Sequence, residues 1–286
     1  AKELARGVGL VAVNAMVATT QYADSVRTAL RAGADAIVCG AGLPKDLPAL
    51  ASEVSDSDAA IAPIVSSGRA AGLICKLWDR HYGRIPDFVV LEGPEAGGHL
   101  GFSRQDLDAP PSLSDLLREV LTALAPFRDK AGRDIPVFVA GGVKNGADMA
   151  RYMKEGAAGA QFATRFIATA ECDASEGYKQ RLLAAKDDDI TLVKSPVGMP
   201  GRALHSPLIR RVEDGTQPPP ERCVKCIVTC DGKNAPYCIS KALIAARNGD
   251  WENGLFFCGA AGGEVNTLST VPEQMAQIMD EWRSAQ

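Results

Sequence analysis

Apolar residues between positions 8 and 170 alternate between two periodicities. Short β-branched runs that end in small residues are each followed by a stretch in which apolar side chains recur every three or four positions. The first pattern predicts buried strands, and the second predicts amphipathic helices. Their regular alternation predicts repeated βα units, which build a parallel sheet covered by helices.

The chain is expected to contain six strands of this kind, at residues 8–13, 36–39, 61–65, 88–91, 137–140 and 159–162. Small or polar residues follow these strands closely: Asn14, Gly40, Ser66, Gly93, Gly141 and Thr164. Parallel α/β sheets bind ligands at the carboxyl ends of their strands, where small residues let a ligand approach the backbone. We therefore expect the functional site at this edge of the sheet.

The pattern changes beyond about Asp188. Residues 196–201 and 217–220 are rich in proline and glycine and predict loops. Four cysteines follow, and helices are expected at 239–248 and 271–283. We interpret residues 1–190 as one α/β domain and residues 191–286 as a cysteine-rich, mainly helical C-terminal extension.

Composition narrows the class of protein. Hydrophobic residues make up 46% of the chain and charged residues 23%, and the net charge is −4, which is typical of a globular protein that binds small molecules rather than nucleic acid. The most apolar stretch, Val8–Ala18, is too short to span a membrane. Nothing around Lys2 and Glu3 has the pattern of a secretion leader. The expectation is a cytoplasmic protein without a membrane or nucleic-acid partner; the oligomeric state is left open.

One histidine stands in a setting suited to chemistry. The segment from Glu92 to His99 contains three glycines and directly follows an apolar strand, so it would place an imidazole on a flexible loop at the strand's carboxyl end. The alternative is a glycine-rich turn whose histidine merely faces solvent. The other two histidines, His81 and His205, lie among polar residues and are expected on the surface.

Two later loops have the features of a phosphate site. Gly141 and Gly142 separate a strand from a helix start, and the segment Gln161–Arg165 follows the next strand. Backbone amides at a helix start attract phosphate, and two consecutive loops of this kind near the end of the repeat match the phosphate site of many (β/α)₈ barrels. Each loop alone could equally be an ordinary structural turn.

The order and spacing of four segments resemble the nitronate monooxygenase family, formerly called 2-nitropropane dioxygenases. The segments are Glu95–His99, Ala140–Val143, Gln161–Phe166 and Gly198–Arg202. The related enoyl-ACP reductase II family shares much of this pattern. The resemblance covers about residues 8–205 and implies a (β/α)₈ TIM barrel that holds FMN at the carboxyl ends of its strands.

The resemblance also implies roles for single residues. His99 corresponds to the catalytic base, and an ordinary histidine pKa near 6.5 would let it exchange protons at neutral pH. Gly141, Gly142, Ala163 and Thr164 would hold the FMN phosphate. The remaining contacts to FMN would come from Asn14, Glu92, Ala96, Gly97 and Gln161.

This chain departs from the family in its number of strands. Six are expected before the C-terminal extension, whereas the family barrel has eight. The first two βα units are therefore missing. We expect either that the sequence lacks an N-terminal segment of the natural protein, which is the favoured interpretation because an open barrel exposes a strand edge, or that the barrel is truncated.

A second departure is the spacing C-x₂-C-x₃-C-x₇-C, formed by Cys223, Cys226, Cys230 and Cys238. Four thiolates can hold a [4Fe–4S] cluster or a structural Zn²⁺ ion. The compact first three cysteines and the more distant fourth favour the cluster, because zinc usually takes two separated C-x₂-C pairs. Unliganded thiols are the third alternative.

These expectations lead to one main hypothesis for function and two alternatives. The main hypothesis is an FMN-dependent oxidoreductase that oxidises a nitronate or a similar small molecule. The first alternative is a flavin-dependent reductase of an activated double bond, supplied with electrons by NAD(P)H or another donor through an iron–sulfur cluster. The second is a non-catalytic barrel that binds a phosphorylated ligand.

Overall fold

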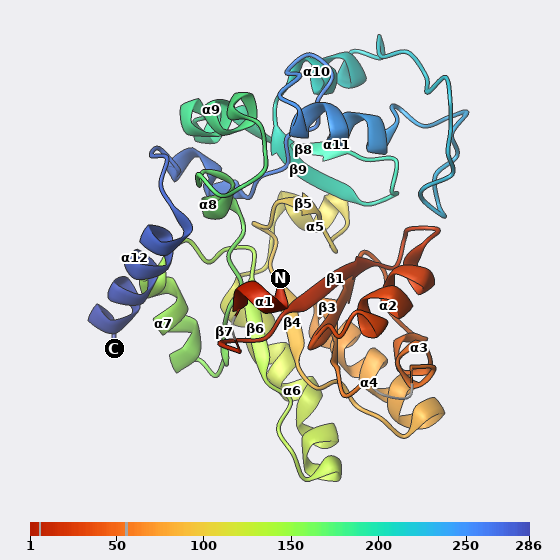
Figure 1. Cartoon of the computed structure of the whole chain (residues 1–286), viewed down its shortest axis with the longest axis vertical. Helices are drawn as coiled ribbons and strands as arrows, with labels where there is room; N and C mark the ends of the chain where they lie inside the picture. The colour runs from red at the N-terminus through yellow and green to blue at the C-terminus, as the bar shows by residue number, and fades with distance from the viewer. Residues whose placement is uncertain (6, 55–56) are drawn as a thin grey trace.

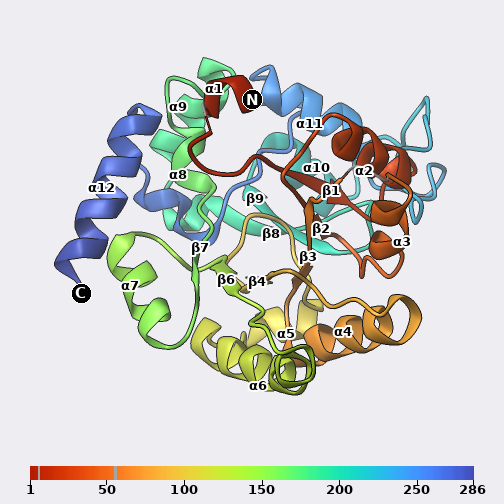
Figure 2. The same ribbon diagram turned by 60° about the horizontal axis from the view of Figure 1, so that its bottom comes forward.

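The computed structural model describes residues 1–5, 7–54 and 57–286. Its centre is a parallel sheet with six strands, and the order across the sheet follows the chain (Figures 1 and 2). The strands are β1 (Ala12–Met16), β2 (Ala36–Gly40), β3 (Ala60–Val65), β4 (Val89–Glu92), β6 (Val137–Ala140) and β7 (Gly159–Ala160). Their connecting helices are α2 (Tyr22–Arg31), α3 (Leu47–Ser52), α4 (Gly68–Tyr82), α6 (Leu113–Ala131) and α7 (Gly146–Lys154). The expected βα architecture is confirmed.

The sheet does not close into a complete barrel. Within the residues that the structure describes, β1 pairs only with β2 and β7 pairs only with β6. The first strand also begins later than its apolar run predicts, at Ala12 rather than Val8. Val8 and Leu10 are 83% and 77% exposed, because the ladder with β2 begins at the pair Ala12–Ala36.

Alternate residues of the strands enter two apolar cores. Ile37 packs with the fully buried Trp78 of α4 in the larger core, between the sheet and its helices. Val38, Ala62 and Val90 form a smaller cluster on the other face of the strands. Burial on both faces explains why these strands are almost continuously apolar in the sequence.

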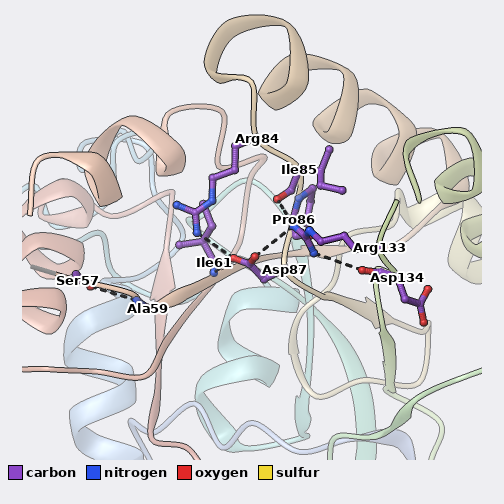
Figure 3. Close-up of polar contacts among 9 residues, drawn as sticks. All are labelled: Ser57, Ala59, Ile61, Arg84, Ile85, Pro86, Asp87, Arg133 and Asp134. Atoms are coloured by element: carbon purple, nitrogen blue, oxygen red, sulfur yellow. Dashed lines mark hydrogen bonds and ion pairs between the residues drawn. The ribbon is translucent and has the colours of Figure 1, made fainter. Parts of the chain in front are cut away.

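The Asp87 carboxylate holds the amino ends of β3 and β4 together (Figure 3). This is the edge of the sheet opposite to the expected site. Asp87 accepts hydrogen bonds from the Ile61 amide at 2.8 Å and from the Arg84 guanidinium at 3.0 Å. Arg133 also donates to Asp87, and it binds the carbonyl oxygens of Ile85 and Pro86. These contacts tie β3 to the segment before β4.

A second, antiparallel sheet lies next to α5 (Arg104–Asp108). Its order is β5 (Gly98–His99), β9 (Pro200–Leu204) and β8 (Ile190–Lys194). Residues 196–201 were expected to be a loop, but they form the turn and the first part of the second strand of a hairpin. Gly198 permits this turn because its φ is +86°. The hairpin bonds to β5, so it carries the histidine segment.

The rest of the chain is largely helical. It contains α1 (Lys2–Ala5) at the start, and α8 (Thr164–Ile167), α9 (Glu176–Ala184), α10 (Pro207–Glu213), α11 (Ile239–Arg247) and α12 (Val271–Ser284) after β7, with short 3₁₀ turns at Asp187–Asp189 (η1) and Ala260–Glu264 (η2). Figures 1 and 2 both show α12 lying beside α7 of the barrel wall. The domain boundary at residue 190 stays a prediction. None of the helices described is long and apolar enough to cross a membrane.

Candidate active site

A cleft of about 410 Å³ lies at the carboxyl ends of β4, β6 and β7. Residues from η2 and α12 complete its wall. With the exception of Asn14, every residue expected to contact FMN lines this cleft: Glu92, Ala96, Gly97, Gly141, Gly142, Gln161, Ala163 and Thr164. The structure therefore brings together residues as far apart in the chain as Glu92 and Thr164.

Asn14 lies elsewhere. It is an exposed residue of the edge strand β1, in register with Val38 of β2. The strands β2 and β3 separate it from β4, where the cleft begins. Its contact with a flavin stays an expectation from the resemblance alone.

The segment Glu92–His99 packs closely against Gly141 on one side and against Gly259 on the other. A Cβ atom added to Gly141 would lie 2.6 Å from the Ala96 Cβ atom, and one added to Gly97 would lie 2.6 Å from the Gly259 amide nitrogen. Real Cβ atoms do not approach that closely, so both positions require glycine. These glycines thus shape the wall of the cleft through close packing.

Arg202 holds the histidine segment in place. Its Nη1 atom donates hydrogen bonds to the carbonyl oxygens of Pro94 at 2.6 Å and Ala96 at 2.8 Å. Burial lowers the pKa of the guanidinium from its usual value, but arginine remains charged at any physiological pH. The sequence resemblance includes Arg202 without indicating this positioning role.

The loop after β7 is bound to the C-terminal part of the chain. The Gly259 amide donates a hydrogen bond of 2.9 Å to the Thr164 hydroxyl oxygen. Gly142, across the cleft, has a φ of +128°, and a Cβ atom there would come no closer than 3.5 Å to Leu113. A Cβ atom at Gly142 would therefore make only ordinary van der Waals contacts, and the requirement for glycine comes from the backbone conformation.

The amino end of α7 is already neutralised, which the sequence did not predict. Glu281 of α12 accepts a hydrogen bond of 2.9 Å from the Gly146 amide, and its carboxylate lies 3.6 Å from the Arg165 guanidinium. Lys144 forms an ion pair of 2.6 Å with Glu264. A phosphate in the cleft would thus rely on the amides of the two strand-end loops more than on the dipole of α7.

His99 lies on β5, beside the cleft but outside its lining. Its Nε2 atom is 2.7 Å from the Ser195 hydroxyl oxygen, and its ring meets the Phe257 ring edge-on with centroids 5.1 Å apart. Burial lowers the pKa of His99 from 6.5 to about 4. This corrects the expectation of a group that titrates near neutral pH, because the imidazole is neutral there.

Glu92 ends β4 and faces the cleft. Burial raises the pKa of its carboxyl to about 7, and a hydrogen bond from the Gly101 amide opposes that effect only in part. Glu92 thus changes its charge near neutral pH, a property that was expected of His99. Sequence periodicity cannot reveal either pKa value, since both depend on burial by distant segments of the chain.

The four clustered cysteines line a second, very small cavity of about 10 Å³. All four are free thiols. As they stand, no group of three or more His, Cys, Asp or Glu side chains in the described part of the chain is arranged to hold a metal ion. A further cysteine, Cys258, lies apart from these four and is buried among Leu182, Leu204 and Phe256.

Known proteins are similar to this chain in sequence. A protein of Mycobacterium tuberculosis named (3aS,4S,5R,7aS)-5-hydroxy-7a-methyl-1-oxo-octahydro-1H-indene-4-carboxyl-CoA dehydrogenase is 34% identical over 131 residues, which cover 46% of this chain and 33% of that protein. A nitronate monooxygenase of Paraburkholderia phytofirmans is 29% identical over 201 residues, or 70% of this chain and 50% of that protein. The chain thus spans between a third and a half of the length of these relatives.

Solved structures are similar in fold. The structure of FabK from Thermotoga maritima matches with a TM-score of 0.74 at 23% sequence identity, covering 99% of this chain and 79% of that one. The likeness supports the expected TIM-barrel architecture, here without closure. The family model described as nitronate monooxygenase matches residues 2–281. This chain belongs to the nitronate monooxygenase family.

Proposed function

We propose that this chain forms the cofactor-binding core of an FMN-dependent oxidoreductase that oxidises a small nitronate or a similarly stabilised carbanion. The observation that carries this proposal is the convergence of three glycine- or alanine-rich strand-end loops, those around Gly97, Gly142 and Ala163, on one cleft. Family membership supports the same reaction class.

The cleft fits FMN in size and chemistry. Its volume of about 410 Å³ lies within the range of roughly 300–1,000 Å³ found for small-molecule sites. Gly141 and Gly142, in the loop after β6, line the cleft together with Ala163 and Thr164, in the loop after β7. The backbone amides of these two loops would hold the phosphate. Gln161, which also lines the cleft, would bind the ribityl chain or the ring. When bound, FMN would supply the electron-accepting ring.

His99 would act as the base that removes the α proton of a neutral nitroalkane, which yields the nitronate that is then oxidised. Its low pKa, about 4, keeps the imidazole neutral at pH 7, so it can accept a proton without first losing one. The Ser195 hydroxyl fixes the ring from the side of Nε2.

The proposal is tested with the full chain and with His99→Ala. The absorption spectrum of the purified protein should show flavin bands, and anaerobic addition of a nitronate should bleach them faster than NADPH does. His99→Ala should retain flavin but slow bleaching by the neutral nitroalkane by roughly 10²–10⁴, whereas bleaching by the preformed nitronate, which has already lost that proton, should change little. Bleaching by NADPH alone would support the enoyl-reductase alternative, whereas absence of flavin would support a non-catalytic barrel.

A further inference from the structure

The segment between α10 and α11, residues 214–238, has few packing interactions of its own. We call it the cysteine loop. It contains no helix and no named strand, and Ile227 and Tyr237 are its only buried apolar side chains, whereas Val224 and Val228 are 74% and 67% exposed. Two buried side chains contribute only a few kcal/mol, which does not offset the entropy of ordering such a long loop. Another interaction must therefore keep the cysteine loop ordered.

Four thiols surround one small space in this loop. Cys223, Cys226, Cys230 and Cys238 all line the cavity of about 10 Å³, with Ile239 on its apolar wall. That volume is roughly the space of one water-sized sphere. Four thiolates brought around one such space would repel one another unless a cation neutralised them.

The backbone around the first two cysteines is shaped for sulfur ligation. Lys225 has a φ of +51°, which is uncommon for a residue other than glycine, and its amide donates a hydrogen bond of 3.4 Å to the Cys223 sulfur. The Ser240 hydroxyl donates a hydrogen bond of 3.0 Å to the Cys226 sulfur. Donors directed at sulfur stabilise a thiolate more than a thiol.

The fourth cysteine also lies where its surroundings stabilise a thiolate. Cys238 occupies the cap position before α11, a helix of nine residues. The amino end of a helix carries partial positive charge and favours a negatively charged sulfur. Cys230 thus lies among three thiols that each have a donor or a helix end to support a negative charge.

We propose that Cys223, Cys226, Cys230 and Cys238 are the ligands of a thiolate-bound metal centre, either one Zn²⁺ ion or an iron–sulfur cluster. The sulfurs do not form a ligand set as they stand, so binding must draw them together. Cys223 is exposed and can move inward at little cost. Metal binding and local folding are coupled in such sites, which accounts for the order of a loop with little apolar packing.

The proposed centre would stabilise the mouth of the barrel. The Thr20 amide donates to the Cys226 carbonyl oxygen at 3.1 Å, and the Val228 amide donates to that of Ala18 at 2.9 Å. The Thr229 hydroxyl donates a hydrogen bond of 2.8 Å to the Val197 carbonyl oxygen, in the turn that begins at Ser195. The cysteine loop therefore joins the end of β1 to the turn that supports His99.

The test is elemental analysis of the full chain purified anaerobically, with assay of acid-labile sulfide. Cys226→Ser removes one proposed ligand. Cys172→Ser is the matched control, because Cys172 is also a partly buried free thiol but does not line the cavity. Since Cys226→Ser could fail to fold, the wild-type protein is also stripped with a chelator, then titrated with Zn²⁺ and followed by limited proteolysis within residues 214–238.

We expect one zinc per chain, or iron with sulfide, in the wild-type protein and in Cys172→Ser, and a loss of more than about tenfold in Cys226→Ser. Stripping should expose the cysteine loop to protease, and zinc should protect it again. The proposal is overturned if the wild-type protein contains neither metal and takes up no zinc, or if Cys226→Ser retains the wild-type metal content.

Discussion

His99 and Ser195 are 96 residues apart in the chain, yet the histidine Nε2 atom lies 2.7 Å from the serine hydroxyl oxygen. That oxygen also accepts a hydrogen bond of 3.3 Å from the Val197 amide, and its second lone pair can accept one from the histidine. When Nε2–H donates to Ser195, the lone pair on Nδ1 is left free to accept a proton. Ser195 thus positions the imidazole in the neutral form that the proposed role of His99 requires.

Replacing Ser195 with alanine should slow flavin bleaching by a neutral nitroalkane by roughly 10- to 100-fold, less than loss of the base itself. The acid limb of the pH–rate profile, expected near pH 4, should also move downward, because the lost oxygen accepted a hydrogen bond from Nε2–H and so favoured the protonated ring. Ser206→Ala is the control, since Ser206 is a fully buried serine that donates to Gly254. An unmoved acid limb would mean that Ser195 is only structural.

Glu92→Gln should change how stability depends on pH. The folded carboxyl keeps its proton up to about pH 7, compared with 4.5 when unfolded, so the unfolded state binds fewer protons between these values. Stability linked to Glu92 is therefore lost as pH rises from 4.5 to 7. Relative to wild type, the variant should gain roughly 2–3 kcal/mol across this window, measured by urea unfolding of flavin-free protein. A constant difference would contradict the raised pKa.

Gly142→Ala should weaken flavin retention more than stability. Alanine at a φ of +128° strains the loop and adds a methyl group at the cleft. Gly42→Ala is a close match for strain, because Gly42 has a φ of +126° but does not line the cleft. Flavin content, read from the visible absorption of bound flavin, should fall only in Gly142→Ala. Equal flavin loss in both variants would show that strain alone is responsible.

Asp87→Asn should lower stability and leave flavin bound. The substitution weakens the charge-assisted contacts with Arg84 and Arg133 at the amino ends of the strands (Figure 3). Each such hydrogen bond contributes about 1–2 kcal/mol, so the midpoint of urea unfolding should fall measurably. A drop in flavin content at low urea would instead show that this network reaches the cleft.

Much of the fold follows from local sequence. The strands at Ile61–Val65 and Val137–Ala140 agree with the structure, because buried parallel strands are continuously apolar. The hairpin of β8 and β9 was missed. Its turn and the start of β9 were expected to be a proline- and glycine-rich loop, so the pairing of β8 with β9 was not predicted.

The sequence predicted which residues line the candidate site better than it predicted their charge states. The strand-end rule brought Gly97, Gly142 and Thr164 to one edge of the sheet. The charge states depend on contacts between distant segments: burial of His99 in the second sheet, and the approach of Glu281 to α7. No local pattern encodes such contacts, so the roles of Ser195 and Arg202 became visible only in the structure.

The most direct test of the central claim is one anaerobic absorption experiment on the full chain. The protein is purified without added cofactor, its flavin is released and identified, and the remaining sample is mixed with a nitronate. The account predicts about one FMN per chain and loss of the flavin absorbance on mixing. Protein that is folded but contains no flavin, and binds none when FMN is supplied, would contradict it.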